Sequence, residues 1–197
     1  MFRPAFLLAL AAMPLAPVAV RAQAADPAAR VAAYNDQVVA IMKARLPLGQ
    51  RTDRFEAAVR AYYDMPAITA LVIGPKWAAS PAADRQAAIA ALTRHSALSL
   101  ARNFASYGGE RFIVDPDVTV RDSSRIVKVT IRTGTSGGDT LLYRMRQSGG
   151  EWRIIDVIAQ GVSQLAVQRA DLARTVATDG VAGVARRLRA IDGGAQR

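Results

Sequence analysis

Hydrophobic positions repeat with two different periods along this chain, and the period changes near Gly108. Before that point, apolar residues recur every three to four positions, which is typical of helices that bury one face. Capping residues, prolines and glycines mark the ends of these segments. The predicted helices run from Asp26-Pro27 to Pro47, over roughly 52–63, from Asp64 to Gly74-Pro75, and from Ser80-Pro81 to Gly108-Gly109.

Beyond Gly108 the apolar residues alternate with polar ones, as they do over 127–131, and this alternation predicts strands. Turn residues divide the region into four or five antiparallel strands, the last of which runs from Trp152 to Ala159. Helical spacing returns over about 163–178 and 181–191, on either side of Gly180. Helices, then an antiparallel meander, then further helices predict an α+β fold.

The first 24 residues have the organisation of a secretory signal peptide. Arg3 precedes an apolar segment of about fifteen residues, and Ala22-Gln23-Ala24 fits the small-residue cleavage site. The segment is short for a membrane span, which needs about 20 apolar residues. We therefore expect a soluble exported protein with a single domain over 25–197, of which 193–197 form a disordered tail.

Composition narrows the class of protein further. The chain has no cysteine, so its stability cannot come from disulfides, and its 51% hydrophobic residues allow a sizeable core. The net charge is +10, and removal of Arg3 and Arg21 with the signal peptide leaves +8. The basic residues are scattered and no nucleic-acid-binding motif accompanies them, so we expect no nucleic acid partner.

Few residues could form a catalytic or metal site. His95 is the single histidine, and without cysteine a zinc site of about four ligands has no support. Gly161 and Ser163 suggest a nucleophile turn, but the Gly-x-Ser-x-Gly pattern breaks at Leu165. We interpret Ser163 as the cap of the following helix and not as the nucleophile of a triad with His95 and Asp156. The sequence contains no glycine-rich phosphate loop.

The last predicted strand is apolar at both parities and has Asp156 in its middle. A strand that is apolar on both sides is expected to be covered on both sides. A carboxylate in such a place must be paired or hydrogen-bonded, and Arg169 is the first candidate partner. The surplus of apolar residues has two interpretations, a well-filled core or a cavity for a hydrophobic ligand.

Three segments of the chain together carry a resemblance to a known family. They are Tyr63-Asp64-Met65-Pro66 with Ile68, Gly74 and Trp77; the segment from Leu100 to Glu110; and the segment from Trp152 to Val157 with Gly161-Val162-Ser163 and Arg169. In this order and spacing, from about residue 52 to 190, they resemble the MlaC family, also called toluene-tolerance auxiliary proteins. The segments 145–150 and 163–166 are closer to HpnM, the relative associated with hopanoid gene clusters.

The resemblance implies a soluble periplasmic carrier that holds lipid acyl chains in an apolar pocket between a curved antiparallel sheet and surrounding helices. Members pass phospholipid between an outer-membrane lipoprotein complex and an inner-membrane MCE-domain ABC transporter. We expect a monomer with no catalytic activity, no metal and no cofactor, and the resemblance implies that its cargo is a phospholipid or a hopanoid. The alternative from another class is an exported lipid hydrolase that uses Ser163.

On this basis we expect the lipid head group at the pocket mouth, near a basic rim such as Arg102, Arg132 or Arg144. Asp156, Ser163 and Arg169 are expected to be structural. The side chains expected to contact lipid are Phe55, Tyr63, Ile68, Val72, Phe104, Val127, Val129, Ile131, Tyr143, Trp152 and Ile154.

Overall fold

The computed structural model describes residues 26–134 and 138–194 and has the predicted α+β order. Its elements are α1 (Pro27–Lys43), α2 (Leu48–Tyr62), α3 (Met65–Ile73), the 3₁₀ helix η1 (Gly74–Trp77), α4 (Ala82–Asn103), β1 (Arg111–Val114), β2 (Thr119–Arg121), β3 (Ser124–Arg132), β4 (Asp139–Ser148), β5 (Glu151–Ala159), β6 (Val162–Ser163) and α5 (Gln164–Gly194). The predicted signal peptide lies outside the described residues. Of the predicted tail, Gly193 and Gly194 belong to α5 and the rest lies outside them.

Side-chain caps that were predicted from the sequence mark the starts of two helices. The Asp26 carboxylate accepts a hydrogen bond from the Ala29 amide at 3.3 Å, and the Asp64 carboxylate accepts one from the Ala67 amide at 3.1 Å. Both contacts satisfy amides that lack a partner in the first helical turn. α2 begins at Leu48, four residues before the predicted start. The helix can start earlier than predicted because Gly49 lies in its first turn, where backbone amides have no helical partner.

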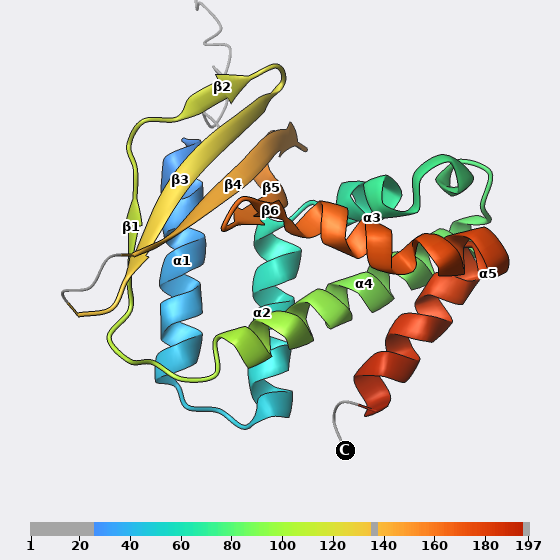
Figure 1. The fold of residues 1–197 in the computed structure, drawn as a ribbon, viewed down its shortest axis with the longest axis horizontal. Helices are drawn as coiled ribbons and strands as arrows, with labels where there is room; N and C mark the ends of the chain where they lie inside the picture. The colour runs from blue at the N-terminus through green and yellow to red at the C-terminus, as the bar shows by residue number, and fades with distance from the viewer. Residues whose placement is uncertain (1–25, 135–137, 195–197) are drawn as a thin grey trace, which may run out of the picture.

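The sheet is antiparallel, in the order β1-β3-β4-β5-β6, with β2 also paired to β3. The long strands β3, β4 and β5 form its centre, and the short β6 adds two residues beside the end of β5. In Figure 1 the sheet lies at one side of the molecule beside α1, and α3, α4 and α5 extend toward the other side. The predicted meander of four or five strands is thus present as β1 to β5, and the two-residue β6 adds a sixth strand that the sequence did not indicate.

A bulge interrupts the pairing of β4 with β5. Tyr143 lies opposite Val157, and Met145 lies opposite Ile154, so β5 has one extra residue between these pairs. Such a bulge reverses the alternation of side chains along the strand. Trp152 and Ile154 therefore share a sheet face with Val157 although their parity differs. Ile154, Ile155 and Asp156 are nevertheless all buried, so the centre of the strand is covered on both sides, as expected from the sequence.

Buried side chains form two hydrophobic clusters. The first joins α1, α2 and the sheet and includes Tyr34, Phe55, Val127, Val129 and Met145. The second joins α3, α4 and α5 and includes Val72, Leu92, Leu172, Val184 and Leu188. Tyr63 and Leu100 pack against both clusters, so they mark the boundary between the two cores.

α5 bends sharply at Gly180, which separates the two helices predicted for this region. Gly180 has φ 65° and ψ −163°, a conformation that is almost restricted to glycine. Before the bend, the Lys76 ammonium donates to the carbonyls of Val176 at 3.0 Å and Ala177 at 2.8 Å. These carbonyls lack helical partners at a helix end, so a cation there is favourable. The second half of α5 then packs against the second cluster through Val184 and Leu188.

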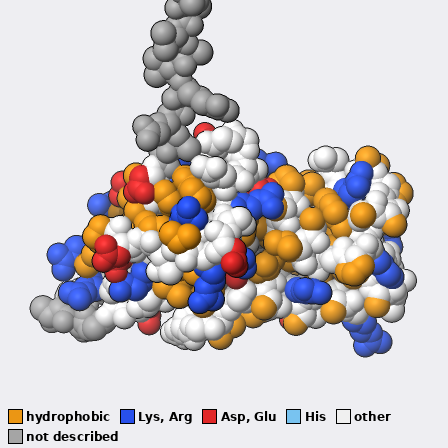
Figure 2. All heavy atoms as spheres, turned by 90° about the horizontal axis from the view of Figure 1, so that it is seen from above, with side chains coloured by type: hydrophobic (Ala, Val, Ile, Leu, Met, Phe, Trp, Pro, Cys, Tyr) orange, Lys and Arg blue, Asp and Glu red, His pale blue; other side chains and the backbone are white. Residues whose placement is uncertain are grey.

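Positive charge is scattered over the face of the molecule that Figure 2 shows. Figure 2 shows Lys and Arg side chains dispersed among hydrophobic side chains over one face of the molecule. Across the part of the chain that the structure describes, no helix combines the length and hydrophobicity needed to cross a membrane.

Candidate binding cavity

A mostly apolar cavity of about 280 Å³ lies at the boundary between the two clusters. Its wall is formed by α1, α2, α3, α4, β4, β5 and the start of α5. The buried part of the wall includes Tyr34, Val38, Val59, Met65, Tyr143 and Ile155. Ile68, Leu100, Phe104, Leu141, Val157 and Leu165 complete the apolar lining. A concave apolar site with a few convergent polar groups is the usual form of a binding site for a hydrophobic ligand.

Three tyrosines bring polar atoms into this apolar wall. Tyr34 comes from α1, Tyr63 follows the last turn of α2, and Tyr143 comes from β4. The Tyr63 hydroxyl donates to the Tyr34 hydroxyl at 3.1 Å, and the Tyr143 hydroxyl donates to Asn35 Oδ1 at 3.1 Å. The Tyr34 ring centroid lies 5.4 Å from that of Tyr63 and 6.0 Å from that of Tyr143, both edge to face.

Burial keeps these phenols neutral. Desolvation raises the pKa of Tyr34 and of Tyr143 well above the ordinary value, with a further contribution from Tyr63 to the shift of Tyr34 and from Tyr34 to the shift of Tyr143. Burial also raises the pKa of Tyr63, with a further contribution from nearby Tyr143. The three hydroxyls therefore act as hydrogen-bonding groups and not as charges.

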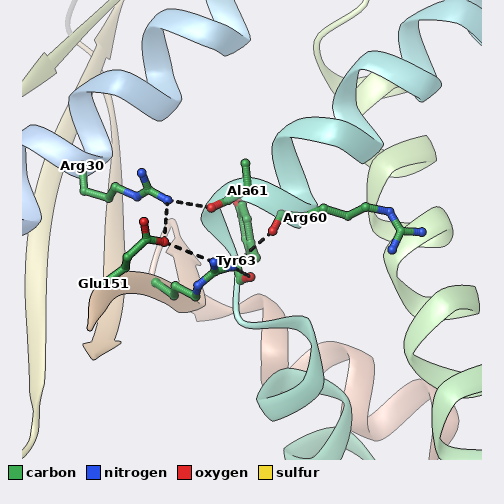
Figure 3. Close-up of polar contacts among 6 residues, drawn as sticks. Arg30, Arg60, Ala61, Tyr63 and Glu151 are labelled. Atoms are coloured by element: carbon green, nitrogen blue, oxygen red, sulfur yellow. Dashed lines mark hydrogen bonds and ion pairs between the residues drawn. The ribbon is translucent and has the colours of Figure 1, made fainter. Parts of the chain in front are cut away.

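Tyr63 is fixed to β5 by its backbone. It forms a parallel bridge with Ile154, and the next amide, that of Asp64, donates to the Ile154 carbonyl at 2.9 Å. Arg30 and Arg153 both form ion pairs with Glu151. Figure 3 shows Arg30 and Glu151 beside the end of α2. Arg30 donates to the Ala61 carbonyl at 2.7 Å.

Arg153 completes this support. It donates to the carbonyls of Arg60 at 3.2 Å and Tyr63 at 3.4 Å (Figure 3). Two guanidinium groups therefore satisfy the carbonyls at the end of α2 and hold the cavity tyrosine in place.

The more exposed part of the lining carries neutral polar groups. Ser96, Ser99 and Asn103 come from α4, and Gln164 and Gln168 come from the first turns of α5. The arginines expected at the mouth, Arg102, Arg132 and Arg144, are not among the lining residues. Arg144 instead donates to the Ser124 hydroxyl at 3.2 Å. Within the described residues, the rim of this cavity is built from hydroxyls and amides.

Asp156 is buried near the middle of β5 and connects that strand to α5. It accepts hydrogen bonds from the Ser163 hydroxyl at 2.7 Å and from the Leu165 amide at 3.0 Å. The Ser163 hydroxyl oxygen also accepts from the Ala166 amide at 3.1 Å, which is the predicted capping role. Arg169, the expected partner of Asp156, is exposed and lies near Gly74. The carboxylate is satisfied by a hydroxyl and an amide, so it needs no cation.

The structure does not bring His95 and Ser163 together as a catalytic triad would require. A triad needs a histidine beside the serine hydroxyl, but the His95 ring nitrogen Nδ1 lies 2.7 Å from Asp192 at the far end of α5. Among the described residues, no group of three or more His, Asp or Glu side chains could hold a metal ion. Ser163 has a structural role, and its hydroxyl is engaged twice.

The structure brings four of the eleven residues expected to contact lipid to the cavity wall: Tyr63, Ile68, Phe104 and Tyr143. The others lie behind or beside it. Val127, Val129 and Ile154 are fully buried in the first cluster, with Trp152 packed against it, and Val72 belongs to the second cluster. Phe55 packs behind Phe104 at 6.2 Å between ring centroids, and Ile131 pairs with Phe112 in the outer part of the sheet.

Several lining residues were missed by the sequence interpretation. Tyr34 and Val38 fall on the apolar face of the first predicted helix, which looks like any other buried face. Ile155 and Val157 have the parity opposite to Ile154, and only the bulge places Val157 on the same face as Ile154. The polar rim could not be recognised in the sequence, because serine, asparagine and glutamine residues on a helix usually lie on its solvent-exposed face.

Comparison with known proteins gives a family and a fold. The family model described as MlaC protein matches residues 32–190, which includes Tyr34 and every strand. Among solved structures, the phospholipid-binding protein from Ralstonia solanacearum, determined in complex with a phospholipid, matches with a TM-score of 0.68 and 19% sequence identity. The match covers 88% of this chain and 100% of that one. At this identity the likeness shows a common fold.

Proposed function

The chain belongs to the MlaC family, and from that premise we propose that it is a lipid-binding protein whose cargo occupies the cavity at the boundary of the two clusters. The observation that carries the proposal is an apolar cavity with a neutral polar rim in a fold shared with a phospholipid-binding protein. An amphipathic lipid matches this arrangement, because its chains suit the apolar wall and its head group suits the rim.

The energetics favour reversible loading. Each CH₂ group that leaves water contributes about 0.8 kcal/mol, so a lipid chain gains many kcal/mol on entering the cavity from water. The gain relative to a membrane is small, because an aliphatic wall resembles the bilayer interior. A protein with this wall exchanges lipid with membranes or membrane proteins instead of retaining it irreversibly.

The volume of the cavity bears on how the cargo fits. About 280 Å³ is near the lower end of the range for small-molecule sites, roughly 300–1,000 Å³. A lipid with two chains therefore requires the cavity to widen. Since the cavity lies between two separately packed clusters, it can widen at their boundary while each cluster stays intact.

The family and the sequence support a proposal for the cellular role. We propose that the protein is a periplasmic carrier, exported by its first 24 residues, which passes phospholipid between an outer-membrane lipoprotein complex and an inner-membrane MCE-domain ABC transporter. A hopanoid cargo, as in the HpnM branch, is the alternative within the same function. The role is non-catalytic, which is supported by the capping bonds of Ser163.

Filling the cavity tests the proposal. Ile68→Trp places a large side chain in the cavity wall, whereas Leu71→Trp makes the same change on the exposed side of α3. We expect Ile68→Trp to weaken binding of phosphatidylcholine with a fluorescent acyl chain by about tenfold, equivalent to about 1.4 kcal/mol. Leu71→Trp should bind like the wild type. Equal binding by both folded variants would place the lipid elsewhere.

Ser163→Ala separates a carrier from a hydrolase. The variant should lose about 1 kcal/mol of stability with its helix cap and still bind the fluorescent phosphatidylcholine. Chromatography of lipid incubated with wild type and variant should recover it intact in both cases. Lipid cleavage by the wild type that disappears in Ser163→Ala would contradict the carrier proposal.

A further inference from the structure

The tyrosine cluster in the cavity wall has more hydrogen-bond donors than acceptors to receive them. Tyr34 and Tyr63 share one hydrogen bond, so whichever hydroxyl donates, the other hydrogen has no acceptor among the described residues. The Tyr143 hydroxyl is directed to Asn35 Oδ1, and the Asn35 amide nitrogen has no partner in the described chain. Buried donors are rarely left without an acceptor, so this surplus calls for an explanation.

The hydroxyl donors that lack an acceptor are placed where a bound ligand could receive them. Tyr34, Tyr63 and Tyr143 all line the cavity, and among the described residues no hydrogen bond joins their hydroxyls to the other polar side chains of the lining, which include Asp156 and Gln164. A hydrogen bond formed in such an apolar environment is stronger than one in water, and an unmet donor there is correspondingly costly. Burial also keeps the phenols protonated, so they can donate across the physiological pH range.

We propose that the Tyr34–Tyr63 hydroxyl pair donates a hydrogen bond to an oxygen atom of the bound lipid, so that the cavity favours lipids which carry an acceptor oxygen into it. This inference rests on the proposed lipid-binding function and adds a determinant of cargo choice to it. The shared chemistry is an uncharged acceptor oxygen. It has two sources in lipids: the ester carbonyls near the head group, and a hydroxyl on the hydrophobic part.

Two matched pairs of lipids test this inference and distinguish the sources. The first pair is a diester phosphatidylcholine and its diether analogue with equal chain lengths. The second is phosphatidylcholine with hydroxystearoyl chains and with stearoyl chains. Each is used to displace a fluorescent-acyl phosphatidylcholine from the wild type, Tyr34→Phe, Tyr63→Phe and Tyr62→Phe. Tyr62 packs on Tyr34 at 5.5 Å between ring centroids but does not line the cavity, so Tyr62→Phe is the matched control.

The wild type should prefer the oxygen-bearing member of one pair by about fivefold, the equilibrium equivalent of one net hydrogen bond. A preference in the first pair identifies the ester carbonyl, and a preference in the second identifies the chain hydroxyl. The preference should disappear in Tyr34→Phe and Tyr63→Phe and persist in Tyr62→Phe. A purely packing role for the tyrosines would change the affinity for both members of a pair alike.

Equal affinity of the wild type within both pairs would overturn the inference and leave the proposed function standing. Preferences that survive in the folded Tyr34→Phe and Tyr63→Phe variants would overturn it as well. A wild type that binds none of the lipids would instead contradict the proposed function itself. If one phenylalanine variant fails to fold, the other and the wild-type preferences still decide the question.

Discussion

Asp156 shows how a single buried side chain joins two elements. Its carboxylate accepts hydrogen bonds from the Ser163 hydroxyl and the Leu165 amide, so it fixes the middle of β5 to the start of α5 beside the cavity. The sequence was sufficient to predict that this carboxylate is structural, because a charge in an apolar strand must be satisfied. It was not sufficient to identify the partners, because a capping amide and hydroxyl leave no charge pattern in the sequence.

Asp156→Ala should lower the free energy of unfolding by about 3 kcal/mol, because it leaves a buried hydroxyl and a helix amide without their acceptor. The thermal midpoint should fall by roughly 6–12 °C for a chain of this size. Asp156→Asn keeps one of the two acceptor oxygens and replaces the other with an amide nitrogen, so it should cost less than Asp156→Ala. Asp171→Ala, at an exposed position on α5, is the control and should leave the midpoint unchanged. Thermal unfolding that is equal for Asp156→Ala and the control would contradict this account.

The cavity tyrosines predict a loss of stability at alkaline pH. Their folded pKa values are raised above the unfolded value of about 10. Their contribution to stability is therefore complete below about pH 10 and is lost as the pH rises above it. Each phenol should add about 1.4 kcal/mol per pH unit to the decline.

Urea unfolding between neutral and alkaline pH measures this slope. Replacing Tyr34, Tyr63 and Tyr143 together with phenylalanine should flatten it. Phenolate absorbance should show that these three of the five tyrosines ionise only as the protein unfolds. Complete ionisation of all five in the folded protein would show that the cluster is not buried as described.

At the scale of elements, helix ends were more predictable than strand faces. Asp26, Asp64 and Ser163 cap the helices expected of them, because capping depends on neighbouring residues alone. The faces of β5 depend on its pairing with β4, where the bulge shifts the register between Arg144 and Met145. No local residue marks this bulge, so the parity of the apolar residues was a misleading guide to which of them share a face.

The bend of α5 at Gly180 can be tested by a single substitution. Gly180→Ala should lower the free energy of unfolding by about 2 kcal/mol, because φ 65° and ψ −163° are strained for any residue with a Cβ. No atom lies within 4 Å of the added Cβ, so the cost comes from the backbone and not from a clash.

Gly193→Ala is the matched control at the end of the same helix. It has open space around the added Cβ and should be neutral or slightly stabilising in urea unfolding. If Gly180→Ala were equally neutral, the bend would not be imposed by the backbone at this residue.

At the scale of the molecule, the change of hydrophobic period predicted the α+β class, and the resemblance predicted the family that the comparison confirms. The cavity could not be derived from the sequence, because a filled core and a lined cavity have the same composition. Its polar cluster joins Tyr34 of α1, Tyr63 just after α2 and Tyr143 of β4, and only the packing of the two clusters brings these residues together.

The central claim is that the cavity holds a lipid. The most direct measurement is to purify the protein from producing cells without detergent, confirm that it is folded by circular dichroism, and identify extracted lipids by mass spectrometry. Wild-type protein should contain lipid in roughly equimolar amount, and Ile68→Trp prepared in parallel should contain much less. A folded wild-type protein that carries no lipid, and takes none up from phospholipid vesicles, would contradict the account.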